Sequence, residues 1–374
     1  MQSLILIAAL AANASVQFDR QRIGDTTYEA ASVFDVDNDG HLDIVSGEYW
    51  FAGPEWTGRH KICSILKQDD YYDDFSDYPM DVNGDGYLDI VTGAWWGMAV
   101  QWRENPKGKP VEWTNHEIAK VGNVERPSFW DIDGDGHVEI VPNTPGNPQQ
   151  IFKLVRDAKG NGTGKFLQHQ VNDIKGTHGL GFGDLNGDGR GDLVFDTGWL
   201  EAPAKPLEQT WEFHAEFGLG GSSSVPILVH DANGDGKADI IVGQGHDYGV
   251  AWWEQGASPD GARTWTKHDI ETKRTQYHEM ALADLDGDGK PELITGKRWR
   301  AHPAGDPGVD DPVGIYWYAI DGGKFTEHII DFGDPKDHSG TGIYMWIQDI
   351  NGDNRPDILA PGKEGMYLFT QRGN

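Results

Sequence analysis

The sequence predicts an all-β fold, a seven-bladed β-propeller, and three observations support this prediction. A nine-residue Asp-rich segment occurs seven times in the 374 residues, with starts 46, 50, 53, 47, 53 and 65 residues apart. Short β-branched and aromatic runs fill the intervals, and no part of the chain shows sustained 3.6-residue periodicity. A repeat of about 50 residues is the length of a four-stranded propeller blade.

All seven Asp-rich segments align without a gap, and their residues are numbered here as positions 1 to 9. Position 1 is always Asp, and position 9 is Asp or Glu. In chain order the segments are DVDNDGHLD from Asp35, DVNGDGYLD from Asp81, DIDGDGHVE from Asp131, DLNGDGRGD from Asp184, DANGDGKAD from Asp231, DLDGDGKPE from Asp284 and DINGDNRPD from Asp349.

Four runs in each unit predict the four strands of a blade. A short apolar stretch precedes the loop, and a β-branched run such as Ile240-Ile241-Val242 follows it. An aromatic run comes third, and an aromatic-x-x-His pattern such as Trp113…His116 comes fourth. The repeated histidines of this fourth run are predicted to be structural: His60, His116, His169, His214, His268 and His328.

The last unit ends at residues 366–369 and has no fourth strand of its own. Near the N-terminus, Phe18-x-x-Gln21-x-Ile23 matches the fourth-strand pattern of the other units. We therefore expect the first strand of the mature chain to pair into the last blade and close the ring. Closure would remove exposed sheet edges, which otherwise promote aggregation.

Residues 1–14 are typical of a signal peptide, with a short apolar run over Leu4–Ala12 and a small-residue cleavage site at Ala12-Asn13-Ala14. The sequence thus predicts cleavage after Ala14, one propeller domain over residues 15–374, and export to the periplasm or the extracellular space. No apolar run is long enough to span a bilayer.

Sixty acidic residues against 31 basic ones give a formal charge of −29, which argues against a nucleic-acid partner. Twenty-four of these acids lie in the seven loops, so the charge indicates bound cations rather than a polyanionic partner surface. The single cysteine, Cys63, excludes an internal disulfide and is expected to be a small buried hydrophobe. A monomer fits these features, and the oligomeric state is left open.

Each loop offers carboxylate or amide oxygens at positions 1, 3 and 5, a carbonyl at position 7 and a carboxylate at position 9. Calcium binds six to eight such oxygens. Glycine at position 6 permits a positive φ, and Asn354 replaces it in the last loop. The alternative is a set of Asx-rich turns without metal. The sequence predicts up to seven structural Ca²⁺ ions, with side-chain ligands Asp35, Asp37, Asp39, Asp43, Asp81, Asn83, Asp85, Asp89, Asp131, Asp133, Asp135, Glu139, Asp184, Asn186, Asp188, Asp192, Asp231, Asn233, Asp235, Asp239, Asp284, Asp286, Asp288, Glu292, Asp349, Asn351, Asp353 and Asp357.

The motif DxDxDGxxD followed by Ile/Leu-Val resembles the FG-GAP/VCBS-type repeats, which are calcium-loop propeller repeats also found in integrin α-subunits. The resemblance covers residues 16–374 and implies the propeller fold and bound calcium. It does not settle the function, because propellers carry many unrelated activities.

Five histidines fall outside the repeated positions, and the predicted topology places all of them at the end of the ring opposite the loops. They are His178, His246, His278, His302 and His338. The same rim receives Tyr78, Glu125, Arg126, Tyr277, Glu279, Lys297 and Arg298, the aromatic residues Tyr49, Trp50, Trp95, Trp96, Trp199 and Trp299, and a long insertion over Arg300–Pro312. Imidazoles could serve there as a general base or as metal ligands, and tryptophan faces suit a sugar ring.

A narrower resemblance rests on Tyr-Trp-Phe-x-Gly-Pro-Glu-Trp (49–56), Trp199-Leu-Glu-Ala-Pro, His178-Gly-Leu-Gly and Tyr277-His278-Glu279. These motifs are similar to the propeller domain of the aldos-2-ulose dehydratase family and of secreted bacterial propellers like it. That family dehydrates keto-sugars by β-elimination, so the resemblance implies a sugar site.

The leading hypothesis is an exported carbohydrate-active lyase or dehydratase. His178 or His278 would remove a proton next to a carbonyl, Arg298 and Lys297 or a metal would hold the enolate, and Tyr277 would protonate the leaving oxygen. Trp50, Trp95, Trp96, Trp199, Glu279 and His302 would contact the substrate. A second divalent ion, zinc, manganese or magnesium, would be held by some of His178, His246, His278 and His338. The alternatives are a non-catalytic glycan-binding or adhesion module and a calcium-stabilised scaffold for protein partners.

Overall fold

The computed structural model describes residues 16–303 and 305–373, and the predicted signal peptide over residues 1–14 lies outside this part. The described residues form strands and turns with no helix. None of them therefore belongs to a helix long and apolar enough to cross a membrane. The prediction of an all-β chain is confirmed for these residues.

The strands group into units of four, except that the last unit has three strands and shares its sheet with β1. Each Asp-rich loop joins the first and second strands of its unit. Strand β1 spans Phe18–Gly24. Unit 1 comprises β2 (Ser32–Phe34), β3 (Asp43–Ser46), β4 (Tyr49–Ala52) and β5 (Gly58–Lys61), followed by the short strands β6 (Lys67–Gln68) and β7 (Tyr71–Tyr72). Unit 2 comprises β8 (Tyr78–Met80), β9 (Asp89–Ala94), β10 (Ala99–Glu104) and β11 (Thr114–Lys120). Unit 3 comprises β12 (Arg126–Trp130), β13 (Glu139–Asn143), β14 (Pro148–Arg156) and β15 (Gly162–Lys175).

The second half of the chain continues the same order. Unit 4 comprises β16 (Leu180–Gly183), β17 (Asp192–Phe195), β18 (Gly198–Glu201) and β19 (Glu212–His214). Unit 5 comprises β20 (Ile227–His230), β21 (Asp239–Gly243), β22 (Tyr248–Ala257) and β23 (Arg263–Thr275). Unit 6 comprises β24 (Met280–Ala283), β25 (Glu292–Gly296), β26 (Val313–Asp321) and β27 (Lys324–Gly333). Unit 7 comprises β28 (Trp346–Gln348), β29 (Asp357–Gly362) and β30 (Gly365–Gln371).

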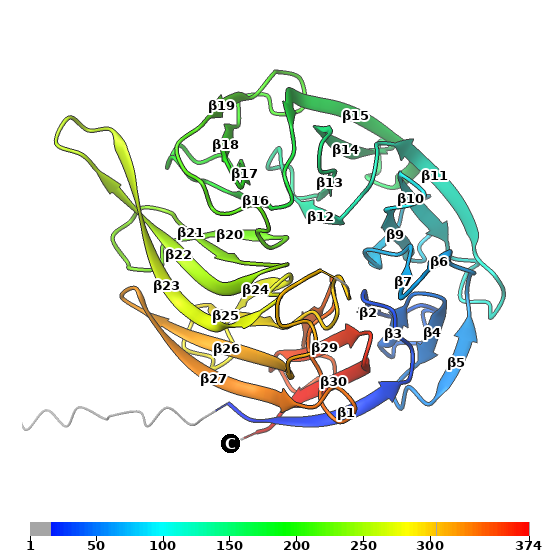
Figure 1. Cartoon of the computed structure of the whole chain (residues 1–374). Coiled ribbons are helices and arrows are strands. Elements are labelled where there is room, and N and C mark those ends of the chain that lie inside the picture. The colour runs from blue at the N-terminus through cyan, green and yellow to red at the C-terminus, as the bar shows by residue number, and fades with distance from the viewer. Residues whose placement is uncertain (1–15, 304, 374) are drawn as a thin grey trace, which may run out of the picture.

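Within each unit the strands pair antiparallel in chain order, and the sheets follow one another around a common centre (Figure 1). Five sheets have four strands, and a parallel contact between β16 and β20 joins units 4 and 5 into one eight-stranded sheet. Strands β6 and β7 form a separate two-stranded ribbon. Strand β1 pairs antiparallel with β30, from Phe18 opposite Gln371 to Gly24 opposite Met366. The first and last strands of the described chain therefore share one sheet.

The core consists of apolar clusters between neighbouring sheets, as expected when two sheets pack face to face. One cluster joins Ile241 and Trp252 of unit 5 to Met280, Leu293 and Tyr316 of unit 6. Similar clusters lie between the other neighbours, for example between units 2 and 3 and between units 6 and 7. This packing fixes each unit against the next and so positions the segments at both ends of the strands.

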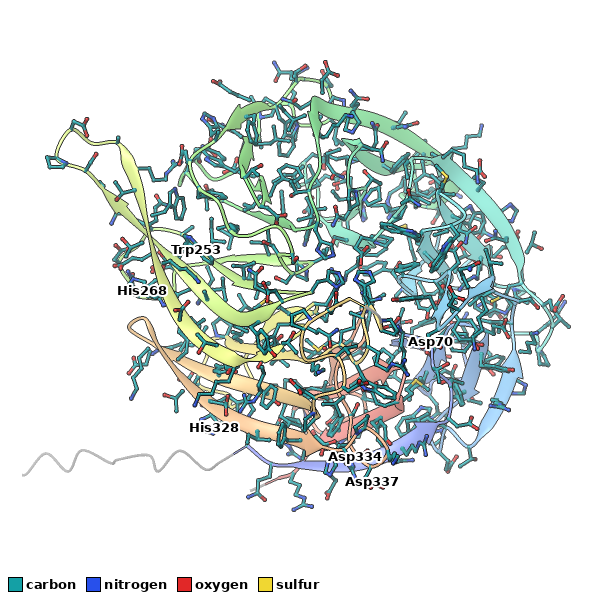
Figure 2. All side chains as sticks on the ribbon, viewed as in Figure 1. Asp70, Trp253, His268, His328, Asp334 and Asp337 are labelled. Atoms are coloured by element: carbon teal, nitrogen blue, oxygen red, sulfur yellow. The ribbon has the colours of Figure 1, made fainter. Side chains whose placement is uncertain are left out.

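The repeated fourth-strand histidines have a structural role. His116 stacks on Trp102 at 4.3 Å between ring centroids, and His268 stacks on Trp252 at 4.6 Å. His268 and His328 lie on the outer strands, away from the centre of the ring (Figure 2). Their stacking matches the prediction that this position is structural.

Trp50 and Trp199, which were predicted to contact substrate, instead pack against the fourth-strand histidines of their own units. Trp50 lies 4.6 Å from His60 and Trp199 lies 4.3 Å from His214. In units 1 and 4 only two residues separate the second strand from the third, so these tryptophans fall inside the third strand rather than in a rim loop. Both are buried, at 3% and 1% exposed.

Candidate functional site

Four potential metal ligands lie together at the end of the strands opposite the Asp-rich loops. Glu125, His178 and His278 precede β12, β16 and β24, whereas His246 follows β21. One carboxylate oxygen and one nitrogen from each imidazole all lie within 4.8 Å of one another. The structure therefore brings three of the five rim histidines, together with a glutamate, around one point. This group of four residues is called the Glu–His cluster below.

In His178 and His246, hydrogen bonds determine which ring nitrogen is free. His178 Nδ1 lies 2.7 Å from the carbonyl oxygen of Ser223, and His246 Nδ1 lies 2.9 Å from Oδ2 of Asp306. Both partners accept, so each Nδ1 carries the proton and each Nε2 keeps a lone pair. The two Nε2 atoms are nevertheless only 2.9 Å apart. Two lone pairs at that distance repel each other unless a proton or a cation lies between them.

The other two members of the cluster are buried. His278 is 0% exposed, and its Nε2 lies 2.9 Å from Oε1 of Glu125, while its Nδ1 has no hydrogen-bond partner among the described residues. A Cβ on Gly245 would come within 3.1 Å of the His278 ring and 3.4 Å of the His178 ring, so a side chain there would crowd both imidazoles. The free lone pairs, the unpaired buried nitrogen and the carboxylate fit a borderline divalent metal such as zinc or manganese.

The electrostatics keep the imidazoles of His246 and His278 neutral and the Glu125 carboxylate charged. Burial, the neighbouring His178 and Arg298 lower the pKa of His246 to about 4. Burial likewise holds the pKa of His278 well below its usual range. Burial alone would raise the pKa of Glu125, but its hydrogen bond with His278 and the charges around it hold that pKa well below normal. Neutral imidazole and ionised carboxylate are the forms that bind metals.

Arg298 is the fixed positive charge beside the cluster. Its Nε donates to Oε1 of Glu29 at 2.9 Å, and its Nη1 lies 3.6 Å from Oε1 of Glu125. Arg298 is 2% exposed and Glu29 is 6% exposed, so the ion pair is desolvated. The guanidinium is shared between two carboxylates, and it thereby holds Glu125 against the histidines.

A cavity of about 300 Å³ lies beside the Glu–His cluster. That volume is at the lower end of the range for small-molecule sites, which is about 300–1,000 Å³. The polar wall includes Glu125, His178, His246, His302 and Arg298, and the remaining wall consists of the aromatic side chains Tyr71, Phe75, Trp95 and Trp96. Of the predicted substrate contacts, Trp95, Trp96 and His302 therefore lie at one cavity with the histidines.

The insertion between β25 and β26, drawn in gold near the centre of the ring in Figure 1, supplies a residue that the sequence did not single out. Asp306 Oδ2 accepts from Nδ1 of His246, from the backbone N–H of His302 at 3.0 Å and from Nε2 of Gln276 at 3.1 Å. Asp306 Oδ1 lies 3.2 Å from Nδ1 of His302, whose ring stacks on His246 at 4.2 Å. The only sequence signal was the length of the insertion, because Asp306 is one of three aspartates in it.

Two residues predicted to take part in catalysis lie away from the cavity wall. Tyr277 is 0% exposed and packs in the core between units 5 and 6, where its hydroxyl donates to Oε2 of Glu271 at 3.1 Å. Burial raises the pKa of Tyr277 well above its usual value. Lys297 points into the insertion and donates to the carbonyl oxygen of Gly308. Lys297 and Arg298 both follow the last residue of β25, and their side chains point to different partners.

Two further residues have other partners. Glu279 pairs with Arg126, with Oε1 3.1 Å from Nη2, and both side chains are buried. Arg126 lies in turn over the ring of Tyr344. His338 is outside the Glu–His cluster, because its Nδ1 lies 2.7 Å from Oδ1 of Asp331 in the same rim segment.

The seven Asp-rich loops share one conformation. Position 6 has a positive φ throughout, from 84° to 91° at the six glycines and 64° at Asn354, as the sequence predicts. The position 9 carboxylate always accepts the backbone N–H of position 2, at 2.7 to 3.0 Å. Acidic groups of loops 1, 3 and 6 converge within 4.8 Å of one another, as a cation site requires.

Loop 3 differs from the others because a lysine lies among its carboxylates. Lys153 Nζ is 2.6 Å from Asp133 and from Asp135 and 3.2 Å from Glu139. The residues of loop 3 therefore already surround a positive charge. In loops 2, 4, 5 and 7 a basic side chain lies beside the carboxylate at position 5 alone.

The fold and the repeated loops define a repeat protein of the β-propeller type. A family model described as FG-GAP-like repeat matches two stretches, residues 81–141 and 231–295. The chain thus carries FG-GAP-like repeats, and the resemblance inferred from the loop motif is confirmed.

A curated relative, the T-cell immunomodulatory protein homolog of Plasmodium falciparum (isolate 3D7), is 27% identical over 134 residues, which are 31% of this chain and 19% of that protein. This chain thus spans about a fifth of that relative's length. Among solved structures, BBS1N in complex with ARL6DN has a TM-score of 0.50 at 12% identity and covers 95% of this chain and 96% of that one. Rhamnogalacturonan lyase YesW has a TM-score of 0.47 at 12% identity, over 95% and 75% of the two chains. The first of these structures shares the fold.

Proposed function

We propose that the chain is an exported, seven-bladed β-propeller in which β1 closes the ring and the Asp-rich loops bind structural calcium. The pairing of β1 with β30 supports the closed ring. The common loop conformation and the converging carboxylates support calcium, which prefers clustered carboxylate and carbonyl oxygens. Export rests on the sequence of residues 1–14.

At the opposite rim we propose a metal-dependent lyase that removes water from a small, oxygen-rich substrate such as a keto-sugar. One observation carries this proposal: the Nε2 atoms of His178 and His246 face each other at 2.9 Å while both Nδ1 atoms are committed to acceptors. Glu125 and His278 complete a four-residue ligand set. A divalent ion held by these residues would supply Lewis acidity toward a carbonyl oxygen.

The remaining cavity residues have roles that their contacts support. His302 accepts the proton from the carbon next to the carbonyl at its Nε2, because Asp306 faces its Nδ1 at 3.2 Å. Tyr71 lines the cavity, and burial raises its pKa to about 12, so its hydroxyl stays protonated. This hydroxyl donates to the carbonyl oxygen of Ala301, and it would turn from that acceptor to protonate the departing hydroxide. The products are an unsaturated ketone and water. Trp95 and Trp96 present aromatic faces to the C–H patches of a sugar ring.

Metal analysis tests the centre directly. Protein stripped with a chelator and reloaded with Zn²⁺ or Mn²⁺ should retain one equivalent of transition metal beyond its calcium. His178→Gln and His246→Gln should lose that equivalent. His338→Gln is the matched control, because this rim histidine binds Asp331 and should leave the metal content unchanged. Loss in the control, or retention in both ligand variants, contradicts the centre.

Activity is tested separately with neutral keto-sugars, by following the ultraviolet absorbance of the conjugated product. Metal-dependent product formation supports the lyase. Metal binding without turnover favours a glycan-binding module instead, since the aromatic wall of the cavity would serve binding equally well.

A further inference from the structure

The side chain of Lys153 lies where a calcium ion would lie in loop 3. Lys153 is on β14, and its ammonium is 2.6 Å from Asp133 Oδ2, 2.6 Å from Asp135 Oδ2 and 3.2 Å from Glu139 Oε1. An ammonium has three N–H donors, and three carboxylates from loop positions 3, 5 and 9 are within reach of them. Glu139 is 0% exposed, so its charge needs a partner inside the protein.

The repeat architecture provides an internal comparison for this position. In every unit one third-strand residue faces loop position 9 across the antiparallel pairing, and in unit 3 that residue is Lys153. In units 1 and 6 it is alanine, Ala52 and Ala319. In units 2, 4 and 5 it is glutamate, Glu104, Glu201 and Glu254. Unit 3 is therefore the one unit in which this position carries a positive charge.

In units 1, 2, 4, 5 and 6 the facing residue follows the charge of the loop, whereas unit 7 combines Asn351 at position 3 with a neutral Thr370. In units 2, 4 and 5, loop position 3 is Asn, and the facing glutamate brings the acidic groups to four. In units 1 and 6, position 3 is Asp, the loop itself has four acidic groups, and the facing residue is neutral. Loop 3 also has four acidic groups, Asp131, Asp133, Asp135 and Glu139, but here the facing residue supplies a cation.

The Lys153 ammonium and a calcium ion cannot both bind among the carboxylates of loop 3. Calcium requires oxygens at about 2.3–2.6 Å, and the carboxylates that would provide them are bound to Nζ. An ion among the same oxygens would lie within about 3–4 Å of the ammonium, where like charges repel strongly in a partly buried site. The lysine is part of the folded chain, so it competes with free calcium at a high effective concentration.

We propose that Lys153 replaces calcium in loop 3, so that its ammonium neutralises the loop and at most six of the seven loops bind Ca²⁺. This inference rests on the proposed calcium function of the other loops. It also makes unit 3 independent of calcium, because its loop is held by an ion pair within the unit.

Substitution of the lysine tests the proposal. Lys153→Ala gives loop 3 the residue that units 1 and 6 already have, and the variant should bind one more Ca²⁺ per chain than the wild type. The count is made by elemental analysis and by calorimetric titration of chelator-treated protein. Lys237→Ala is the matched control, because Lys237 contacts only one loop carboxylate, Asp235 at 2.7 Å, and is 45% exposed. The control should keep the wild-type stoichiometry.

A second readout guards against poor folding of the variant. Without calcium, Lys153→Ala should melt at a lower temperature than the wild type, and added calcium should restore more stability to the variant than to the wild type. Lys153→Met, which keeps the apolar stem, should behave in the same way. An unchanged calcium count in both Lys153 variants overturns the proposal. If the wild type binds no calcium, the calcium function of the other loops is refuted. The inference about Lys153 is then still tested by whether Lys153→Ala binds one Ca²⁺ per chain.

Discussion

The carboxylate of Asp306 should control metal affinity without touching the metal. Asp306 accepts from Nδ1 of His246 at 2.9 Å and also binds His302 and Gln276. In Asp306→Asn, the amide has one oxygen for these three donors and presents an NH₂ group in place of the other. When that NH₂ faces His246, the ring prefers the tautomer with the proton on Nε2, and this nitrogen can then no longer bind a metal.

The size of the effect follows from the role of the contact. Loss of such an outer hydrogen bond typically weakens metal affinity about 10- to 100-fold, which corresponds to about 1.4–2.7 kcal/mol. Three of the four ligands remain in Asp306→Asn, so the site should be weakened rather than abolished. In contrast, His246→Gln removes a ligand and should have a larger effect.

The assay is a competition titration of Zn²⁺ between the protein and a chromophoric chelator. Asp310→Asn is the control, since Asp310 is an exposed residue of the same insertion and does not contact an imidazole in the described structure. The melting temperatures of the metal-free proteins separate a structural effect from a metal effect. If Asp306→Asn and the wild type bind Zn²⁺ equally tightly, the tautomer argument is refuted.

Three further predictions concern stability. Removal of calcium with EDTA should lower the melting temperature sharply, because each independent site adds about 2.7 kcal/mol when free calcium is 100 times its Kd; an unchanged melting curve would show that the loops are empty. Arg298→Met removes the closer of the two cations beside buried Glu29 and leaves Lys363 at 3.8 Å, so the free energy of unfolding should fall by less than the about 3–5 kcal/mol of a fully unpaired buried charge. Glu29→Gln in the same chain should restore part of this loss in denaturant titrations. Burial lowers the pKa of Lys297 to about 8, whereas a lysine in the unfolded chain has a pKa of about 10.4. Between these two pH values the unfolded chain holds more protons than the folded chain, so the free energy of unfolding should rise with pH. Lys297→Met should lack this rise in melting temperature between pH 8 and pH 10, and an identical slope in both proteins would contradict the assignment.

The sequence was most informative where residues repeat. The strand order, the loop conformation and the structural role of the fourth-strand histidines follow from residues that recur in register, such as the pair Trp252 and His268. It was least informative for side-chain direction at the rim. Lys297 and Arg298 are adjacent in sequence, yet Lys297 binds Gly308 in the insertion while Arg298 binds Glu29 of unit 1.

Long-range partners could not be predicted for a related reason. Asp306 contacts His246 across 60 residues, and Glu29 contacts Arg298 across 269. Such pairs depend on how the units close around the centre, and a single sequence carries no signal for that arrangement. Likewise, the facing position of Lys153 becomes visible only when the strand register is known.

Repetition also explains why the candidate site lies where it does. Glu125, His178 and His278 each stand six residues before the first Asp of their loop, and Glu29 and Phe75 occupy the same position in units 1 and 2. Arg298, Lys363 and Trp95 share a second position, fourteen residues after the first Asp. The repeat therefore places two equivalent positions of each unit at the rim. The side chains at these two positions differ from unit to unit. Because the packing and the common conformation of the Asp-rich loops hold the units in the same geometry, the rim positions are free to vary, and the chemistry of the cavity is set by substitutions that leave the scaffold unchanged.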